Sequence, residues 1–215
     1  QTNNGGNNIV QVSSNSADNI EKSTDQHSIQ IYNNIMGKIA NNPSININTQ
    51  LNNPSLQQEL TTHQMANIAQ QLISNGEIGQ ANEFLSMEVE AHSDSVRLSQ
   101  LYAKTLYLKN QFVQALAILS NLAPTFYDHT DYYNLMANIY MKLNQTAIAN
   151  QIYQHLVQVQ PNSFQYWLGL AIANQRLNNK DIAISAYQHT LSLTPIDSNI
   201  ARFSRQQLYL LQKRI

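Results

Sequence analysis

Few residues in this 215-residue chain have the types and spacings that a catalytic or metal site requires. A 34-residue interval separates His155 from His189, and residues 128–131 form the polar run Asp-His-Thr-Asp. If the two histidines occupy equivalent points of stacked repeats, about 10 Å separates them, too far for the ~2 Å bonds of a shared zinc ion. The polar run precedes an apolar periodic segment, where Asp and Thr serve as helix caps. These residues therefore predict surface and capping roles.

The rest of the sequence offers no recognisable reaction chemistry. It contains no cysteine, which excludes a disulfide framework and a thiolate zinc site. It has no Gly-rich phosphate loop, no HExxH pair and no nucleophile elbow. A net charge of −1 and a pI of about 6.6 give no electrostatic footprint for nucleic acid. We therefore predict a protein that is not an enzyme, binds no nucleic acid and uses no cofactor or metal.

The same 34-residue interval dominates the chain. Two series of small residues keep it: Ala69, Ala103, Ala137, Ala171 and Ala81, Ala115, Ala149, Ala183. A third series in the same phase contains types that suit a left-handed residue just past a helix end: Gly76, Asn110, Asn144 and Asn178. Between them, apolar residues recur at i, i+3, i+4 and i+7, the spacing of one helical face. This period predicts a solenoid of helix pairs, since one unit cannot bury its apolar face alone.

The fourth unit carries the clearest motif: Trp167, Leu170, Ala183, Tyr187 and Pro195. It resembles the tetratricopeptide repeat, a 34-residue pattern of Trp, Leu, Ala, an aromatic residue and Pro. The resemblance implies an all-α fold, a right-handed α-solenoid of about four helix-turn-helix units. We expect it to span residues 55–195, with units at about 62–95, 96–129, 130–163 and 164–197. Residues 198–215 predict an amphipathic helix that caps the open end.

Two further segments precede the solenoid. Residues 1–28 are polar and rich in Asn, and we predict a disordered linker. Residues 29–54 predict a short amphipathic helix and an extended segment. For residues 29–50 two roles have equal weight: packing onto the solenoid or into the groove of a neighbouring molecule, giving a homo-oligomer, or a linker with a transient helix. No apolar run is long enough to span a bilayer, but the chain starts with Gln, so we consider a removed upstream anchor or signal.

The concave side of such a solenoid is lined by the first helix of each unit. Counting from the buried alanines, we predict a groove for protein or peptide segments lined by Ile73, Arg97, Gln100, Lys104, Tyr107, Asn134, Asn138, Met141, Leu168 and Ile172. Gln70, Asp131 and Gln175 lie on the same rows. Amide side chains there suit a peptide backbone and the apolar ones suit side chains. The alternative is binding through the convex face or an edge.

The resemblance also argues against one ligand of related repeats. Some co-chaperone modules clamp a chaperone's C-terminal carboxylate with Lys and Asn on their first helix. The matching positions hold Ala66 and Gln70, which cannot form that cationic clamp.

Residues 166–173, Tyr-Trp-Leu-Gly-Leu-Ala-Ile-Ala, together with the flanking Tyr153, Leu156, Asp181 and Tyr187, are similar to a narrower family. These are the MshN-like biogenesis proteins of the mannose-sensitive haemagglutinin (MSHA) type IV pilus. That resemblance implies a scaffold for pilus or secretion machinery at the bacterial envelope, on the periplasmic side of the inner membrane. The alternative is a soluble cytoplasmic adaptor or a secreted effector that docks a protein partner.

Overall fold

The computed structural model describes residue 37 and residues 60–213, and every element in that part is helical. The chain divides into two units, Gln1–Leu60 and Thr61–Ile215. The second unit contains α2 (Thr62–Ser74), α3 (Ile78–Ala91), α4 (Val96–Leu108), α5 (Phe112–Ser120), α6 (Thr130–Lys142), α7 (Thr146–Val159), α8 (Phe164–Arg176), α9 (Lys180–Leu193) and α10 (Asn199–Lys213). The predicted linker 1–28 and the 29–54 segment, apart from Gly37, lie outside the described residues.

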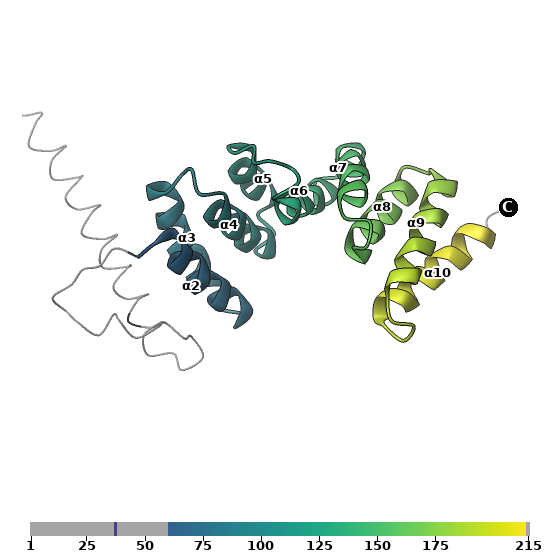
Figure 1. Ribbon diagram of the computed structural model, residues 1–215, viewed down its shortest axis with the longest axis horizontal. Helices are drawn as coiled ribbons and strands as arrows, with labels where there is room; N and C mark the ends of the chain where they lie inside the picture. Colours follow the sequence, from purple (N-terminus) through teal and green to yellow (C-terminus); the bar gives the residue numbers. More distant parts are fainter. Residues whose placement is uncertain (1–36, 38–59, 214–215) are drawn as a thin grey trace, which may run out of the picture. The chain divides into compact units, whose positions relative to one another are not determined.

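Each helix packs against the next one along the chain, so that α2 to α9 form four consecutive pairs (Figure 1). The first helices of neighbouring pairs also contact each other: α2 with α4, α4 with α6, and α6 with α8. The second helices make no comparable contacts with one another in this unit. The first helices therefore form an inner row, as expected for a solenoid. The predicted all-α arrangement of stacked helix pairs is confirmed.

The two alanine series lie where helices cross. All eight of these alanines are completely inaccessible to solvent. A methyl group is the smallest side chain that still favours a helix, so two backbones can approach closely at each crossing. The two alanine series therefore recur every 34 residues because each helix pair has the same crossing points.

The third series ends the first helix of each pair in a left-handed residue. Gly76 has a φ of 80°, and Asn110, Asn144 and Asn178 have φ values of 59–61°. The residue after each of them donates its N–H to a carbonyl five positions back, as in Gln145 N to Tyr140 O at 2.9 Å. This is the hydrogen-bond pattern of a Schellman cap, which turns the chain into the second helix. The predicted role of this series is confirmed.

The second pair departs from the others, because α5 has only nine residues whereas α3, α7 and α9 have 14. Pro161 and Pro195 follow the ends of α7 and α9 at the same repeat position, but the proline here is Pro124, three positions early. A proline at that point cannot continue a helix, so the chain leaves it at Ser120. Residues 121–129 form a loop instead of the last helical turns.

Two adjacent tyrosines of α6 satisfy the carbonyl groups that the shortened helix leaves free. The Tyr132 hydroxyl donates to Leu119 O and to Leu122 O, the latter at 3.1 Å. The Tyr133 hydroxyl donates to Pro124 O at 2.7 Å, and its ring stacks on Phe126 with centroids 4.4 Å apart. These bonds hold the loop against the third pair, since buried carbonyl groups need donors.

Candidate functional site

A cavity of about 450 Å³ lies along the first helices of the second and third pairs. Its walls are Gln70 of α2, then Arg97, Gln100, Leu101, Lys104, Tyr107 and Leu108 of α4, and Asp131, Asn134, Leu135 and Asn138 of α6. The main spacing within each helix is three or four positions, so one face of α4 meets one face of α6. The cavity is therefore built by the inner row.

The lining repeats with the same interval as the core. Arg97, Gln100 and Lys104 stand one repeat before Asp131, Asn134 and Asn138, and Gln70 stands one repeat before Lys104. Equivalent positions of successive pairs thus lie side by side along the cavity. The scaffold fixes where these side chains are, while their chemical types vary freely from one pair to the next.

The charges in the cavity are unbalanced. Arg97 is exposed and Lys104 is half-buried, and neither forms an ion pair within residues 60–213. Asp131 is the acidic residue of the lining, and its Oδ1 accepts a bond of 3.4 Å from the Tyr166 hydroxyl. The α4 side of the cavity therefore carries two cations that attract an anionic group of a partner.

Two of the four side-chain amides in the lining, Asn138 and Gln100, differ in their hydrogen bonding. Asn138 Nδ2 donates to Asn134 O at 2.9 Å, and Asn138 Oδ1 accepts from the Tyr153 hydroxyl at 3.0 Å. Gln100 forms no hydrogen bond within the described part of the chain, so its donor and its acceptor both face the cavity unused. A side-chain amide of this kind matches the N–H and C=O groups of an extended backbone.

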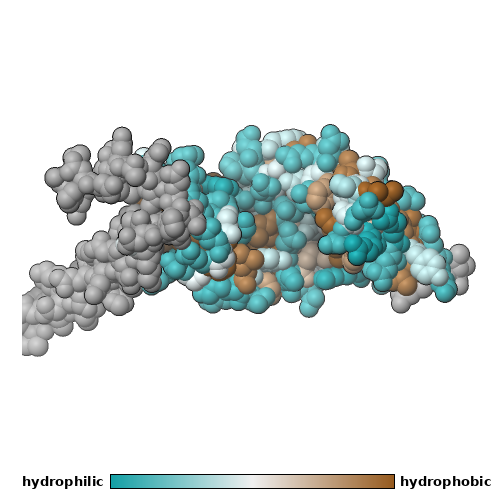
Figure 2. Space-filling view, turned by 90° about the horizontal axis from the view of Figure 1, so that it is seen from below, coloured by the Kyte–Doolittle hydropathy of each residue, from teal (hydrophilic) through white to brown (hydrophobic). Residues whose placement is uncertain are grey.

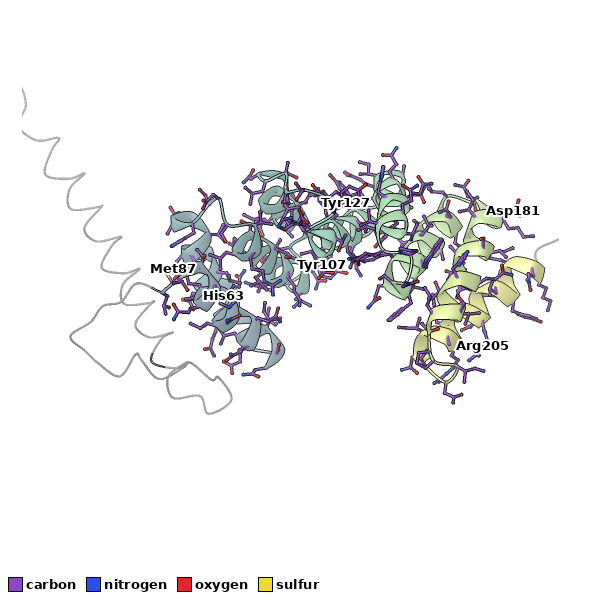
Figure 3. The ribbon with its side chains drawn as sticks, viewed as in Figure 1. His63, Met87, Tyr107, Tyr127, Asp181 and Arg205 are labelled. Atoms are coloured by element: carbon purple, nitrogen blue, oxygen red, sulfur yellow. The ribbon has the colours of Figure 1, made fainter. Side chains whose placement is uncertain are left out.

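Tyr107 closes the cavity at the C-terminal end of α4. Its ring contacts Phe112 edge-on, with centroids 5.5 Å apart, and burial raises the pKa of its hydroxyl. Figure 3 labels Tyr107 together with Tyr127 of the 121–129 loop, which lies on the other edge of the ribbon. Tyr107 offers a fixed aromatic surface with a polar tip, a combination common where proteins bind proteins.

Six of the ten residues predicted for the groove line this cavity: Arg97, Gln100, Lys104, Tyr107, Asn134 and Asn138. Leu168 and Ile172 lie on α8, half-buried against the core of the third and fourth pairs. Their part in binding stays a prediction.

Ile73 and Met141 are each only 9% exposed, which corrects the expectation that they offer open apolar contacts. Both stand in the last turn of a first helix. The Met141 side chain is buried in the core cluster of the third and fourth pairs, and Arg176 of α8 donates to the Met141 carbonyl at 2.9 Å. The next first helix therefore covers this turn of α6.

The lining also contains residues that the predicted rows did not include. Leu101 and Leu135 follow Gln100 and Asn134 directly, and they form the apolar floor between the polar side chains. Leu101 and Leu135 are themselves one repeat interval apart, so the sequence contained this apolar pair one position after the predicted groove residues Gln100 and Asn134.

A second cavity of about 340 Å³ lies beside α5, lined by Asn82, Tyr102, Leu106, Lys109, Gln111, Gln114, Ala117 and Ile118. Two of its polar side chains, Asn82 and Lys109, bind each other, whereas Gln111 Oε1 is buried without a hydrogen-bond partner in the described part of the chain. Asn82 Nδ2 donates to Thr105 Oγ1 at 3.0 Å, and Lys109 Nζ donates to Asn82 Oδ1 at 2.8 Å. The cation of this lining, Lys109, is thus already bound to Asn82, unlike Arg97 and Lys104 of the first cavity.

The residues that could suggest chemistry serve the structure. Asp128 accepts a bond of 2.7 Å from Thr125 Oγ1. His129 is the N-cap of α6 and no side chain caps this helix, so the prediction that Asp and Thr of this run serve as caps is wrong. His189 stacks on Trp167 with centroids 4.3 Å apart, and His155 meets Phe126 edge-on. Within the residues that the structure describes, no group of three histidines and carboxylates is placed to hold a metal ion. No described helix is long and apolar enough for a membrane span.

Comparison with known proteins identifies the repeat. Two family models, each described as tetratricopeptide repeat, match residues 72–139 and 130–163. No curated protein matches the sequence.

Solved structures share the fold. MamA from Desulfovibrio magneticus RS-1 is 16% identical, with a TM-score of 0.61 over 70% of this chain and 82% of that one. YrrB, described as a TPR protein with an unusual peptide-binding site, is 16% identical, with a TM-score of 0.54 over 70% and 78%. PcrH, in complex with the chaperone binding region of PopD, is 17% identical, with a TM-score of 0.51 over 57% and 94%. At such identities the likeness concerns the fold alone.

Proposed function

We propose, from the premise that this chain is a tetratricopeptide repeat protein, that it is a non-enzymatic scaffold which holds a segment of a partner protein along its inner row of helices. The observation that carries this proposal is the cavity of α4 and α6, where unpaired cations and a free amide surround an apolar floor. Such a lining binds backbone, acidic and apolar groups together. Peptide binding by YrrB and partner binding by PcrH, as their descriptions state, support the same use of this fold.

Photocrosslinking tests the location of the binding surface. A benzoylphenylalanine replaces either Tyr107, in the cavity, or Tyr127, which is 76% exposed on the 121–129 loop. We expect the partner to be captured from the Tyr107 position and not from the Tyr127 position. Equal capture from both positions would refute a groove on the inner row.

Charge reversal shows whether the captured partner uses the cavity. Arg97→Glu and Lys104→Glu should abolish capture, since both cations line the cavity. Lys109→Glu is the matched control: it makes the same charge change in the same repeat but at the second cavity, beside Asn82. Loss of capture in the control variant as well would mean that net charge decides binding.

We further propose that the assembly served is a type IV pilus or secretion system of the MSHA type at the bacterial envelope. The support is the sequence likeness around residues 166–173, which form most of α8. Membrane fractionation of cells that carry the native gene tests this. Recovery of the protein with the inner membrane and its copurification with pilus assembly components is the expected result. Recovery in the cytoplasm would refute the envelope role and leave the scaffold role intact.

A further inference from the structure

The last helix, α10, follows the repeat pattern instead of merely covering the end of the last pair. Ser204 and Leu208 stand one repeat interval after Leu170 and Asn174. Leu170, Asn174 and Ser204 are buried, and Leu208 packs against the same core cluster as Leu170. Two positions at which α8 packs into the core are therefore also positions at which α10 does so. Helix α10 packs on α9 as the first helix of a fifth pair would.

Contacts around α10 reproduce those of the inner row. Phe203 meets the ring of Tyr187 edge-on at 6.3 Å, and both residues stand one repeat after the position where Gly169 meets Tyr153. Gln175 of α8 donates to Gln207 Oε1 at 2.8 Å, so successive first helices touch here too. Helix α10 is thus linked to α8 by a side-chain hydrogen bond, at a different position from the bond of Arg176 to Met141 O that links α8 to α6.

One residue of α10 departs from the repeat pattern. Arg205 occupies the position of the small series, one repeat interval after Ala171. An arginine there cannot admit a second helix at close approach, because the crossing needs a small side chain. Arg205, which Figure 3 labels, is exposed and donates through Nη2 to Ile196 O at 2.6 Å.

The inner-row positions of α10 are therefore open to a partner. Arg202 corresponds to Gln100 and Asn134, and Gln206 corresponds to Lys104 and Asn138. Tyr209 corresponds to Tyr107 and is 60% exposed. Lys213 Nζ lies 5.6 Å from the centre of the Tyr209 ring, which adds a second cation to this end.

We infer that α10 is a fifth first helix of the binding groove, and that the occupant is an extended partner segment with acidic residues at both ends and uncharged polar and apolar residues between. This inference rests on the proposed function. The cations Arg97 and Lys104 stand at the α4 end and Arg202 at the α10 end, and half-buried Leu168 and Ile172 lie between them on α8. Between them α6 contributes the polar residues Asp131, Asn134 and Asn138, so the inner row has two basic ends, a polar stretch on α6 and an apolar stretch on α8. On the face drawn in Figure 2, hydrophobic and hydrophilic residues are interspersed.

The length of the segment follows from helix packing. Neighbouring helices pack about 10 Å apart, so the three steps from α4 to α10 cover about 30 Å. An extended chain advances about 3.3 Å per residue, which gives about nine residues between the two acidic groups.

Selection from a phage-displayed library of random 14-residue peptides tests the inference. We expect the full chain to enrich peptides whose acidic residues are separated by about nine positions, with uncharged polar and apolar residues between them. Selection against Arg202→Glu should lose the acidic preference at one end only. Selection against Arg205→Glu, the matched control in the neighbouring row of α10, should retain both.

Fluorescence anisotropy then measures the enriched peptides. Arg202→Glu and Tyr209→Ala should weaken binding about tenfold, while Arg205→Glu changes it less than about twofold. If both variants bind like the native chain while Arg97→Glu fails to bind, α10 is outside the groove and the proposed function stands. If no acidic, two-ended peptide is enriched and Arg97→Glu has no effect, both the inference and the proposed function are wrong. Circular dichroism confirms that each variant is folded.

Discussion

Replacing Gly169 with alanine should destabilise the protein, although alanine favours helices. Gly169 lies within α8, and a Cβ atom there would stand 2.2 Å from Tyr153 Cε1 and 2.4 Å from Tyr153 Cζ. Carbon atoms in contact are about 3.5–4.0 Å apart, so α7 and α8 must separate by about 1 Å or the ring must move. The ring has little room, because Tyr153 is 2% exposed and its hydroxyl binds Asn138.

The magnitude follows from three opposing effects. Overpacking a core costs about 1–3 kcal/mol, and losing the Tyr153 hydrogen bond costs about 1 kcal/mol. The greater helix propensity of alanine returns about 1 kcal/mol. We expect a net loss of about 2 kcal/mol in the free energy of unfolding, or about 4–8 °C in Tm for a protein of this size.

Urea denaturation followed by the fluorescence of Trp167 measures this loss, because Trp167 is the one tryptophan of the chain and lies on α8. Gly79→Ala is the matched control: Gly79 lies in α3, and a Cβ there meets nothing within 4 Å. That variant should be as stable as the native protein or slightly more stable. If Gly169→Ala also raises the stability, the argument from the close approach of α7 and α8 is refuted.

Three further predictions concern the repeat itself. Asn144, with a φ of 59°, should tolerate glycine, whereas Asn144→Ala should cost about 1 kcal/mol in thermal denaturation because αL is strained for alanine. Burial raises the pKa of Tyr132 and Tyr187 to about 12 from 10.0, so the folded state holds these protons more tightly. Stability should therefore be full below about pH 10 and fall between about pH 10 and 12 by about 1.4 kcal/mol per pH unit for each tyrosine, and Tyr132→Phe should reduce that slope in alkaline melts. Amides of α5 should exchange with deuterium faster than those of α3 and α7, because α5 is short and Val113 is 72% exposed; equal protection would contradict this.

The repeat could be predicted from the sequence because its geometry requires particular residue types at particular positions, and few other residue types meet those requirements. Alanine at every crossing and Asn or Gly at every left-handed turn report local requirements that no distant contact overrides. Six of the ten residues predicted for the groove line the cavity for the same reason, since a helical position determines which way a side chain faces.

The structure differs from the sequence-based predictions where neighbouring residues override the repeat pattern. Met141 falls in a groove row by helical phase, but Arg176 and the core of the next pair cover it. Pro124 ends α5 early because it stands three positions before the place where the third and fourth units have Pro161 and Pro195. The repeat pattern of α10 could not be recognised from the sequence because Arg205 stands where the earlier first helices have alanine. Each of these depends on what lies beside a residue in space.

Because the first helices repeat at a constant interval, the proposed binding groove can be lengthened by adding whole repeats. A copy of residues 130–163 inserted before Phe164 would begin and end in register with its neighbours, since both junctions keep the repeat count. Each added copy would lengthen the ligand footprint by one helix spacing, about 10 Å or about three residues of extended ligand. Gene duplication could therefore adjust ligand length in discrete steps.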